Sequence, residues 1–158
     1  MGLRPIGFRR RQKVDLRRRL VFAAAGIGTV YERKQVLVLD DDLICQEVVE
    51  LALSTVGLQV TTAGKAVDAL LLARRRDFDL VIADYFLPDY PGTDFVRLLR
   101  QCEGYEHVPV LLLTGRAGEL DHRRLLDELF LLVLPKGCSS LELLVAVFKC
   151  LAAVRCPA

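Results

Sequence analysis

From residue 35 onward, short apolar segments alternate along the chain with longer segments in which apolar positions recur at helical spacing. Each short segment is rich in apolar residues on both faces. This is typical of parallel strands that are covered by helices on both sides. The pattern therefore predicts five such strands, at residues 35–39, 58–62, 79–83, 108–113 and 131–135.

An amphipathic segment follows each predicted strand. The first, residues 43–56, carries a stripe at helical spacing that consists of Ile44, Val48, Leu51 and Thr55. The last, residues 140–154, begins beside Ser139 and Glu142, which form a predicted capping box. The other predicted helices are residues 65–76, 93–102 and 119–129. Five strand–helix units predict an α/β fold, a doubly wound five-stranded parallel sheet.

The chain has 158 residues, which suits one domain. Its net charge of +2 is split unevenly, because residues 1–34 carry ten Lys and Arg and only two acids. We therefore predict a basic N-terminal extension at 1–34 and an acidic globular domain at 35–158. The extension fits a weak targeting signal, a patch for nucleic acid or a membrane surface, or a segment with no essential role.

No apolar run reaches the ~18 residues that a membrane span requires, so we expect no such span. Five cysteines are present, an odd number without CxxC spacing, and only His107 and His122 could join them around zinc. Buried free thiols in a reducing compartment are the simpler interpretation. The composition thus favours a cytoplasmic protein.

Polar residues directly follow four of the five predicted strands. In an open parallel sheet, ligands bind outside the carboxyl ends of the strands, so these residues converge on one edge if their strands are neighbours. Each residue alone is weak evidence for a binding site, but such residues follow four of the strands at the same edge of the sheet. The residues are Asp40, Asp41 and Asp42, then Asp84, then Thr114, and last Lys136.

This set of residues suits phosphoryl transfer. Two carboxylates 4 Å apart near a protein surface repel each other by roughly 4 kcal/mol. Mg²⁺ relieves such repulsion, and it prefers one or two carboxylates together with water and phosphate oxygens. A lysine can then balance the charge of a phosphoryl group, a hydroxyl can donate to its oxygens, and one carboxylate can be the nucleophile.

Four segments resemble the receiver domain of response regulators: VLVLDDD at 36–42, DFDLVIADYFLPDYPG at 77–92, VLLLTG at 110–115 and LPKG at 134–137. The most specific is the D-x-x-L-P-x-x-x-G run from Asp84 to Gly92. The resemblance covers roughly residues 35–155. It implies a flavodoxin-like (βα)5 fold with strand order 2-1-3-4-5.

The resemblance also implies roles for the residues at the strand ends. Asp84 would accept a phosphoryl group from a phosphohistidine on a histidine kinase or a histidine phosphotransfer protein. Mg²⁺ would bind to Asp84, to Asp41 directly, to Asp40 through water and to the backbone carbonyl of Phe86. Two further residues would contact the phosphoryl group: Thr114 and Lys136.

Three positions depart from the family's usual pattern. Gly137 replaces the proline that commonly follows the lysine, and Val133 replaces an aromatic residue. Phe86, two residues after Asp84, is a bulky apolar group that should not orient water. Asp42 lies at a variable acidic position to which we assign no essential role.

An alternative from another class is a haloacid-dehalogenase-like phosphatase, with Asp40 as nucleophile, Asp42 as acid or base, and Thr114 and Lys136 in support. Such an enzyme needs a late acidic pair, but only Glu142 follows the lysine. It also leaves the D-x-x-L-P-x-x-x-G run without a role. A third reading is a pseudo-receiver that binds a partner without being phosphorylated.

The resemblance favours a signalling module over a turnover enzyme. No DNA-binding domain is expected after the receiver, so the output should be a protein contact. The last predicted helix is apolar nearly all round, with only Glu142 and Lys149 charged in residues 141–154. A homodimer through this helix is therefore one expected partner contact.

Overall fold

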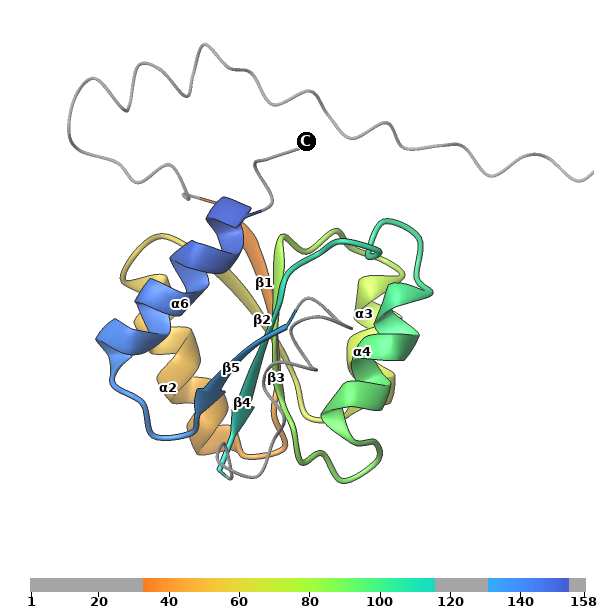
Figure 1. Ribbon diagram of the computed structural model, residues 1–158, viewed down its shortest axis with the longest axis horizontal. Coiled ribbons are helices and arrows are strands. Elements are labelled where there is room, and N and C mark those ends of the chain that lie inside the picture. Colours follow the sequence, from red (N-terminus) through yellow and green to blue (C-terminus); the bar gives the residue numbers. More distant parts are fainter. Residues whose placement is uncertain (1–32, 116–130, 154–158) are drawn as a thin grey trace, which may run out of the picture. The chain divides into compact units, whose positions relative to one another are not determined.

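The computed structural model describes residues 33–115 and 131–153, shown in colour in Figure 1. The strands are β1 (Gln35–Leu39), β2 (Gln59–Ala63), β3 (Leu80–Asp84), β4 (Val110–Thr114) and β5 (Leu131–Pro135). The helices are α2 (Leu43–Ser54), α3 (Ala66–Ala73), α4 (Gly92–Arg100) and α6 (Ser140–Ala153). The helix predicted at 119–129 lies outside the described residues.

All five strands are parallel, and they form one sheet in the order β2-β1-β3-β4-β5. Helices α2 and α6 cover one face, and α3 and α4 cover the other (Figure 1). The doubly wound sheet and the flavodoxin-like strand order are both confirmed. The order reverses between β1 and β3, so the carboxyl ends of these two strands border the crevice where such sheets bind ligands.

The sheet separates two apolar clusters. Successive strand residues point to opposite faces. Leu37 and Leu39 of β1 pack with Phe95 of α4, whereas Val36 and Val38 pack toward α2 and α6. This double burial explains why the central strands consist of continuous apolar runs.

The expectation that every strand is apolar on both faces is wrong for β2. This strand is at the edge of the sheet, pairs only with β1 among the described strands, and has the sequence QVTTA. Gln59 is exposed, and Thr61 and Thr62 are only partly buried. An edge strand has one neighbour, so it tolerates polar side chains that a central strand excludes.

Helix α2 is present where it was predicted, but the stripe that we read in its sequence faces solvent. Ile44 is 71% exposed and Leu51 is 70% exposed. The buried residues of α2 are instead Gln46, Val49, Ala52 and Leu53. The helix thus carries two apolar stripes and buries the one that contains a glutamine.

The capping box before α6 is confirmed. The Ser139 hydroxyl accepts from the Glu142 N–H at 3.3 Å, and a Glu142 carboxylate oxygen accepts from the Ser139 N–H at 2.8 Å. The hydrogen bond from the Ser139 N–H lowers the pKa of Glu142. Among the described residues, no helix has the length and hydropathy required to span a bilayer.

Candidate functional site

Three carboxylates meet at the carboxyl edge of the central strands. Asp84 is the last residue of β3, and Asp40 and Asp41 directly follow β1, the neighbouring strand. Oxygen atoms of the three side chains all lie within 4.8 Å of one another. Asp40 and Asp84 are buried, and Asp41 is exposed. The tertiary structure therefore assembles the predicted acidic cluster.

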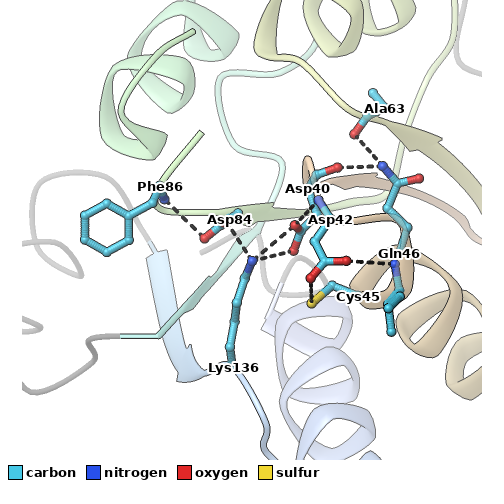
Figure 2. A network of polar contacts seen from close by, with 9 residues as sticks. Asp40, Asp42, Cys45, Gln46, Ala63, Asp84, Phe86 and Lys136 are labelled. Carbon is cyan, nitrogen blue, oxygen red and sulfur yellow. Dashed lines mark hydrogen bonds and ion pairs between the residues drawn. The ribbon is translucent and has the colours of Figure 1, made fainter. Parts of the chain in front are cut away.

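Lys136 reaches this cluster from the segment after β5. Its Nζ lies 2.7 Å from Asp84 Oδ2 and 2.9 Å from Asp40 Oδ2 (Figure 2). The backbone N–H of Lys136 donates to the carbonyl of Thr114 at 2.8 Å, which continues the β4–β5 pairing by one residue. This additional backbone bond directs the Lys136 side chain across the end of β4.

The electrostatics of the cluster follow from this arrangement. Burial raises the pKa of Asp40, although hydrogen bonds from Lys136 and from the Asp42 N–H oppose this shift. Burial opposes the charge of Lys136, but its hydrogen bonds to Asp84 and Asp40 raise its pKa, so it stays protonated. One ammonium group faces three carboxylates, which leaves the site able to attract a cation.

Thr114 ends β4 and is buried. In the β3–β4 register Asp84 pairs with Leu113, so Thr114 stands one residue further along the neighbouring strand.

The backbone N–H of Phe86 donates to Asp84 Oδ1 at 3.1 Å. The Phe86 ring is 46% exposed and points away from Lys136 (Figure 2).

The loop between β3 and α4 folds back tightly on the end of β3. The N–H of Gly92 donates to the carbonyl of Tyr85 at 2.7 Å, and Phe86 forms an isolated bridge with Pro91. A Cβ at position 92 would stand 2.7 Å from the Asp84 carbonyl oxygen and 2.8 Å from Tyr85 Cα. This close approach requires glycine and explains the spacing from Asp84 to Gly92.

A family model for the response regulator receiver domain matches residues 36–148. This match covers most of the chain and includes all the residues at the strand ends. The chain belongs to the response regulator receiver domain family.

Known structures support the same assignment. The chemotaxis response regulator CheY4 of Vibrio cholerae superposes on this receiver domain with a TM-score of 0.68 and 27% identity, over 74% of this chain and 98% of that one. The receiver domain of the Pseudomonas aeruginosa sensor histidine kinase PA1611 was solved with a magnesium ion in its active site cleft. It superposes with a TM-score of 0.68 and 26% identity, over 76% of this chain and 98% of that one.

Full-length relatives are longer than this chain. TcrX of Mycobacterium tuberculosis, described as a probable transcriptional regulatory protein, is 42% identical over 81 residues, which are 51% of this chain and 34% of TcrX. The transcriptional regulatory protein CusR of Escherichia coli is 35% identical over 89 residues, 56% of this chain and 38% of CusR. The matches thus span about a third of these relatives.

The donor set of this receiver domain fits Mg²⁺. The oxygens of Asp40, Asp41 and Asp84 are hard ligands, and a single lysine does not neutralise all three carboxylates. Softer ligands such as thiolates are absent from the described cluster. The residues present therefore suit a small divalent cation.

Asp42 stands apart from the other acids of this receiver domain. Its Oδ1 accepts from the Ile44 N–H at 2.9 Å, which makes it the N-cap of α2. Hydrogen bonds, first that from the Ile44 N–H, lower the pKa of Asp42. The phosphatase alternative needed Asp42 as an acid or base, whereas here it is exposed and engaged as a cap.

Two residues near the site were not identified from the sequence. Gln46 contacts the backbone of Asp40 from α2, and Asp89 contacts the start of α3 from the β3–α4 loop. The signal for Gln46 was present, since it lies at helical spacing with Val49 and Leu53, but the other stripe of α2 was more apolar. No local signal marks Asp89, because its partners are more than twenty residues away.

Proposed function

We propose that this receiver domain accepts a phosphoryl group on Asp84 from a phosphohistidine of a partner histidine kinase or histidine phosphotransfer protein, with Mg²⁺ as cofactor. The observation that carries the proposal is the cluster at the β1 and β3 ends, where Asp84 lies within 4.8 Å of Asp40 and Asp41 and 2.7 Å from the ammonium of Lys136. A nucleophile, a cation site and a fixed positive charge are therefore adjacent.

In the proposed reaction, a carboxylate oxygen of Asp84 attacks the phosphorus atom. The new O–P bond forms as the P–N bond to the donor imidazole breaks, and the imidazole, protonated by solvent on its other ring nitrogen, leaves as the neutral base. Asp84 Oδ1 is oriented by the Phe86 N–H, and Oδ2 by Lys136. Lys136 then balances the charge of the phosphoryl group, and the Thr114 hydroxyl donates to one of its oxygens.

The metal site would be formed by Asp41 and Asp84, by Asp40 through water and by the carbonyl of Phe86. When bound, Mg²⁺ supplies positive charge that relieves the repulsion of the carboxylates and neutralises the phosphoryl oxygens. The PA1611 receiver carries magnesium in its cleft, and the acidic cluster of this chain supports the same cofactor. The product is a phosphorylated protein, so one transfer per molecule is the expected stoichiometry.

The exposed stripe of α2 supports a protein donor. Ile44, Val48 and Leu51 are exposed at helical spacing, and α2 begins only two residues after Asp41. An apolar stripe on the rim of a site suits the side of a partner helix. We propose that the donor packs here while its phosphohistidine reaches Asp84, and that the signal then leaves by a protein contact.

Phosphorylation with a small-molecule donor such as acetyl phosphate tests this proposal. Mass spectrometry should detect one added phosphoryl group that requires Mg²⁺ and is labile in base. Asp84→Asn should abolish the label, whereas Asp40→Asn should only weaken it. A label that persists in Asp84→Asn and disappears in Asp40→Asn would support the phosphatase alternative, and no label on the folded wild type would support the pseudo-receiver.

A further inference from the structure

Gln46 is a buried amide on a helix face that is otherwise apolar. Only 8% of the residue is exposed, and the other buried residues of α2 are Val49, Ala52 and Leu53. A buried amide without hydrogen bonds is costly, so the partners of this side chain show what holds it there. Those partners are carbonyl groups at the ends of two neighbouring strands.

The amide of Gln46 joins α2 to the ends of β1 and β2. Its Nε2 donates to the carbonyl of Asp40 at 2.5 Å and to the carbonyl of Ala63 at 3.4 Å (Figure 2). The N–H of Asp40 donates to the same Ala63 carbonyl at 3.1 Å. The backbone of Asp40 is therefore held at its N–H by the sheet and at its carbonyl by Gln46.

This restraint extends to Asp41. The carbonyl of Asp40 and the N–H of Asp41 belong to one planar peptide group, so a bond that orients the carbonyl also orients the start of Asp41. The Asp40 carboxylate is held separately, by the Asp42 N–H at 2.9 Å and by Lys136. Asp41, the exposed member of the cluster, depends on its backbone for its place.

We propose that Gln46 is a positioning residue for the cation site, and that it acts by fixing the Asp40–Asp41 peptide so that both carboxylates face Asp84. This inference rests on the proposed function in one respect, that the three carboxylates bind Mg²⁺. Gln46 touches neither the metal nor the phosphoryl group. Its loss should therefore weaken Mg²⁺ binding and leave the phosphoryl transfer itself intact once the metal is saturating.

The test compares Gln46→Met, which keeps the length of the side chain and removes its donor, with wild type. Isothermal titration calorimetry with Mg²⁺ alone should show about 10-fold weaker binding, the lower end of the effect expected for partners that orient metal ligands. With acetyl phosphate, the Mg²⁺ concentration for half-maximal labelling should rise by a similar factor. The rate at saturating Mg²⁺ should stay within about twofold of wild type, a change well below the expected loss of affinity.

Val49→Ala is the matched control, because Val49 lies on the same buried face of α2 and makes no contact with the site backbone among the described hydrogen bonds. It should lower the free energy of unfolding and leave the Mg²⁺ affinity unchanged. Should Gln46→Met fail to fold, Gln46→Asn, which draws the amide back by one methylene, should weaken Mg²⁺ binding in the same direction.

Wild-type affinity in a folded Gln46→Met variant would overturn the inference. Equal weakening in Val49→Ala would also overturn it, since the effect would then come from general loss of stability. A folded wild type that binds no Mg²⁺ would instead refute the proposed cofactor, and the inference with it. The wild-type titration thus separates failure of the proposed function from failure of the role of Gln46.

Discussion

The ammonium of Lys136 lies 2.7 Å from Asp84 although the two residues are 52 positions apart in the sequence. Both side chains are largely buried, and the same ammonium contacts Asp40. A buried carboxylate that loses its partner keeps the full cost of its desolvation. The lysine therefore stabilises the metal-free domain in addition to its proposed role with the phosphoryl group.

Lys136→Ala should lower the free energy of unfolding by about 1–3 kcal/mol, a value between those of exposed and fully buried ion pairs. Urea denaturation without Mg²⁺ measures this loss. Adding Mg²⁺ should restore part of the stability, because the cation binds the folded carboxylates and replaces the missing charge. Arg97→Ala, which removes the exposed Arg97–Asp94 pair, is the control and should cost much less. An equal loss in the two variants would refute this account.

Gly92→Ala should destabilise the domain by about 1–3 kcal/mol, as expected for overpacking, because the added Cβ would collide with the backbone of Asp84 and Tyr85. The collision should also displace the acceptor, so labelling by acetyl phosphate should slow. Gly115→Ala provides the comparison, since a Cβ there meets no described atom within 4 Å. Thermal unfolding of both variants decides the matter, and equal melting temperatures would contradict the steric argument.

Asp89 should make the stability of the domain depend on pH. Its two carboxylate oxygens accept from the N–H groups of Ala66 and Val67, both at 3.2 Å, so it caps α3 from another loop. Asp89 is exposed, and the slight desolvation of its carboxylate acts to raise its pKa, but the backbone hydrogen bonds, first that from Ala66, prevail and lower it.

Because the folded pKa is the lower one, the charged Asp89 contributes stability above its unfolded pKa, and this contribution is lost as pH falls through the folded pKa. Asp89→Ala should cost about 1 kcal/mol near neutral pH, as is usual for a lost cap. Its difference from wild type in urea denaturation should shrink below about pH 4, the ordinary range of an aspartate. A difference that does not change with pH would show that the charge has no part in the cap.

Leu51→Glu should impair phosphotransfer from a cognate histidine kinase and leave labelling by acetyl phosphate unchanged. Leu51 is 70% exposed, so the change should hardly affect folding, but a charge in the apolar stripe would have to be desolvated when a helix packs there. Leu141→Glu, an equally exposed change on α6, is the control for this experiment. Loss of both activities in Leu51→Glu would indicate damage to the site rather than to docking.

The homodimer through α6 stays a prediction. Leu141 and Val145 are exposed on this helix, beside a hollow of about 400 Å³ that Leu132 and Leu134 of β5 also line. If copies associate here, Val145→Glu should shift the sedimentation coefficient toward that of a single chain at high concentration. Val48→Glu on α2 serves as the control and should have no such effect. Sedimentation of the wild type as a single chain throughout would refute the dimer.

The structure explains why glycine replaces the family's usual proline in the turn after Lys136. Gly137 has a φ of +86°, a left-handed conformation that glycine adopts readily. Proline, with φ fixed near −65°, could not occupy this turn as it stands. The sequence showed that the usual residue was missing, but only the backbone conformation showed that position 137 is left-handed.

The sequence by itself determined the strands and the residues at their ends. Runs such as VLVL before Asp40 and LVIA before Asp84 must be buried on both faces, and parallel strands deliver their next residues to one edge. The D-x-x-L-P-x-x-x-G spacing also has a local physical reason, because only glycine fits at position 92 against the backbone of Asp84. Local pattern and tertiary structure agree at these positions.

Only the tertiary structure decided which stripe of α2 is buried and what Gln46 contacts. Two stripes at helical spacing run along this helix, and periodicity reports their spacing but not the neighbours that each will meet. The sheet buries the face with Gln46 and Val49, and on that face the amide reaches the carbonyls of Asp40 and Ala63. These partners become adjacent only when β1 and β2 pair, so no local stretch of sequence could reveal the contact.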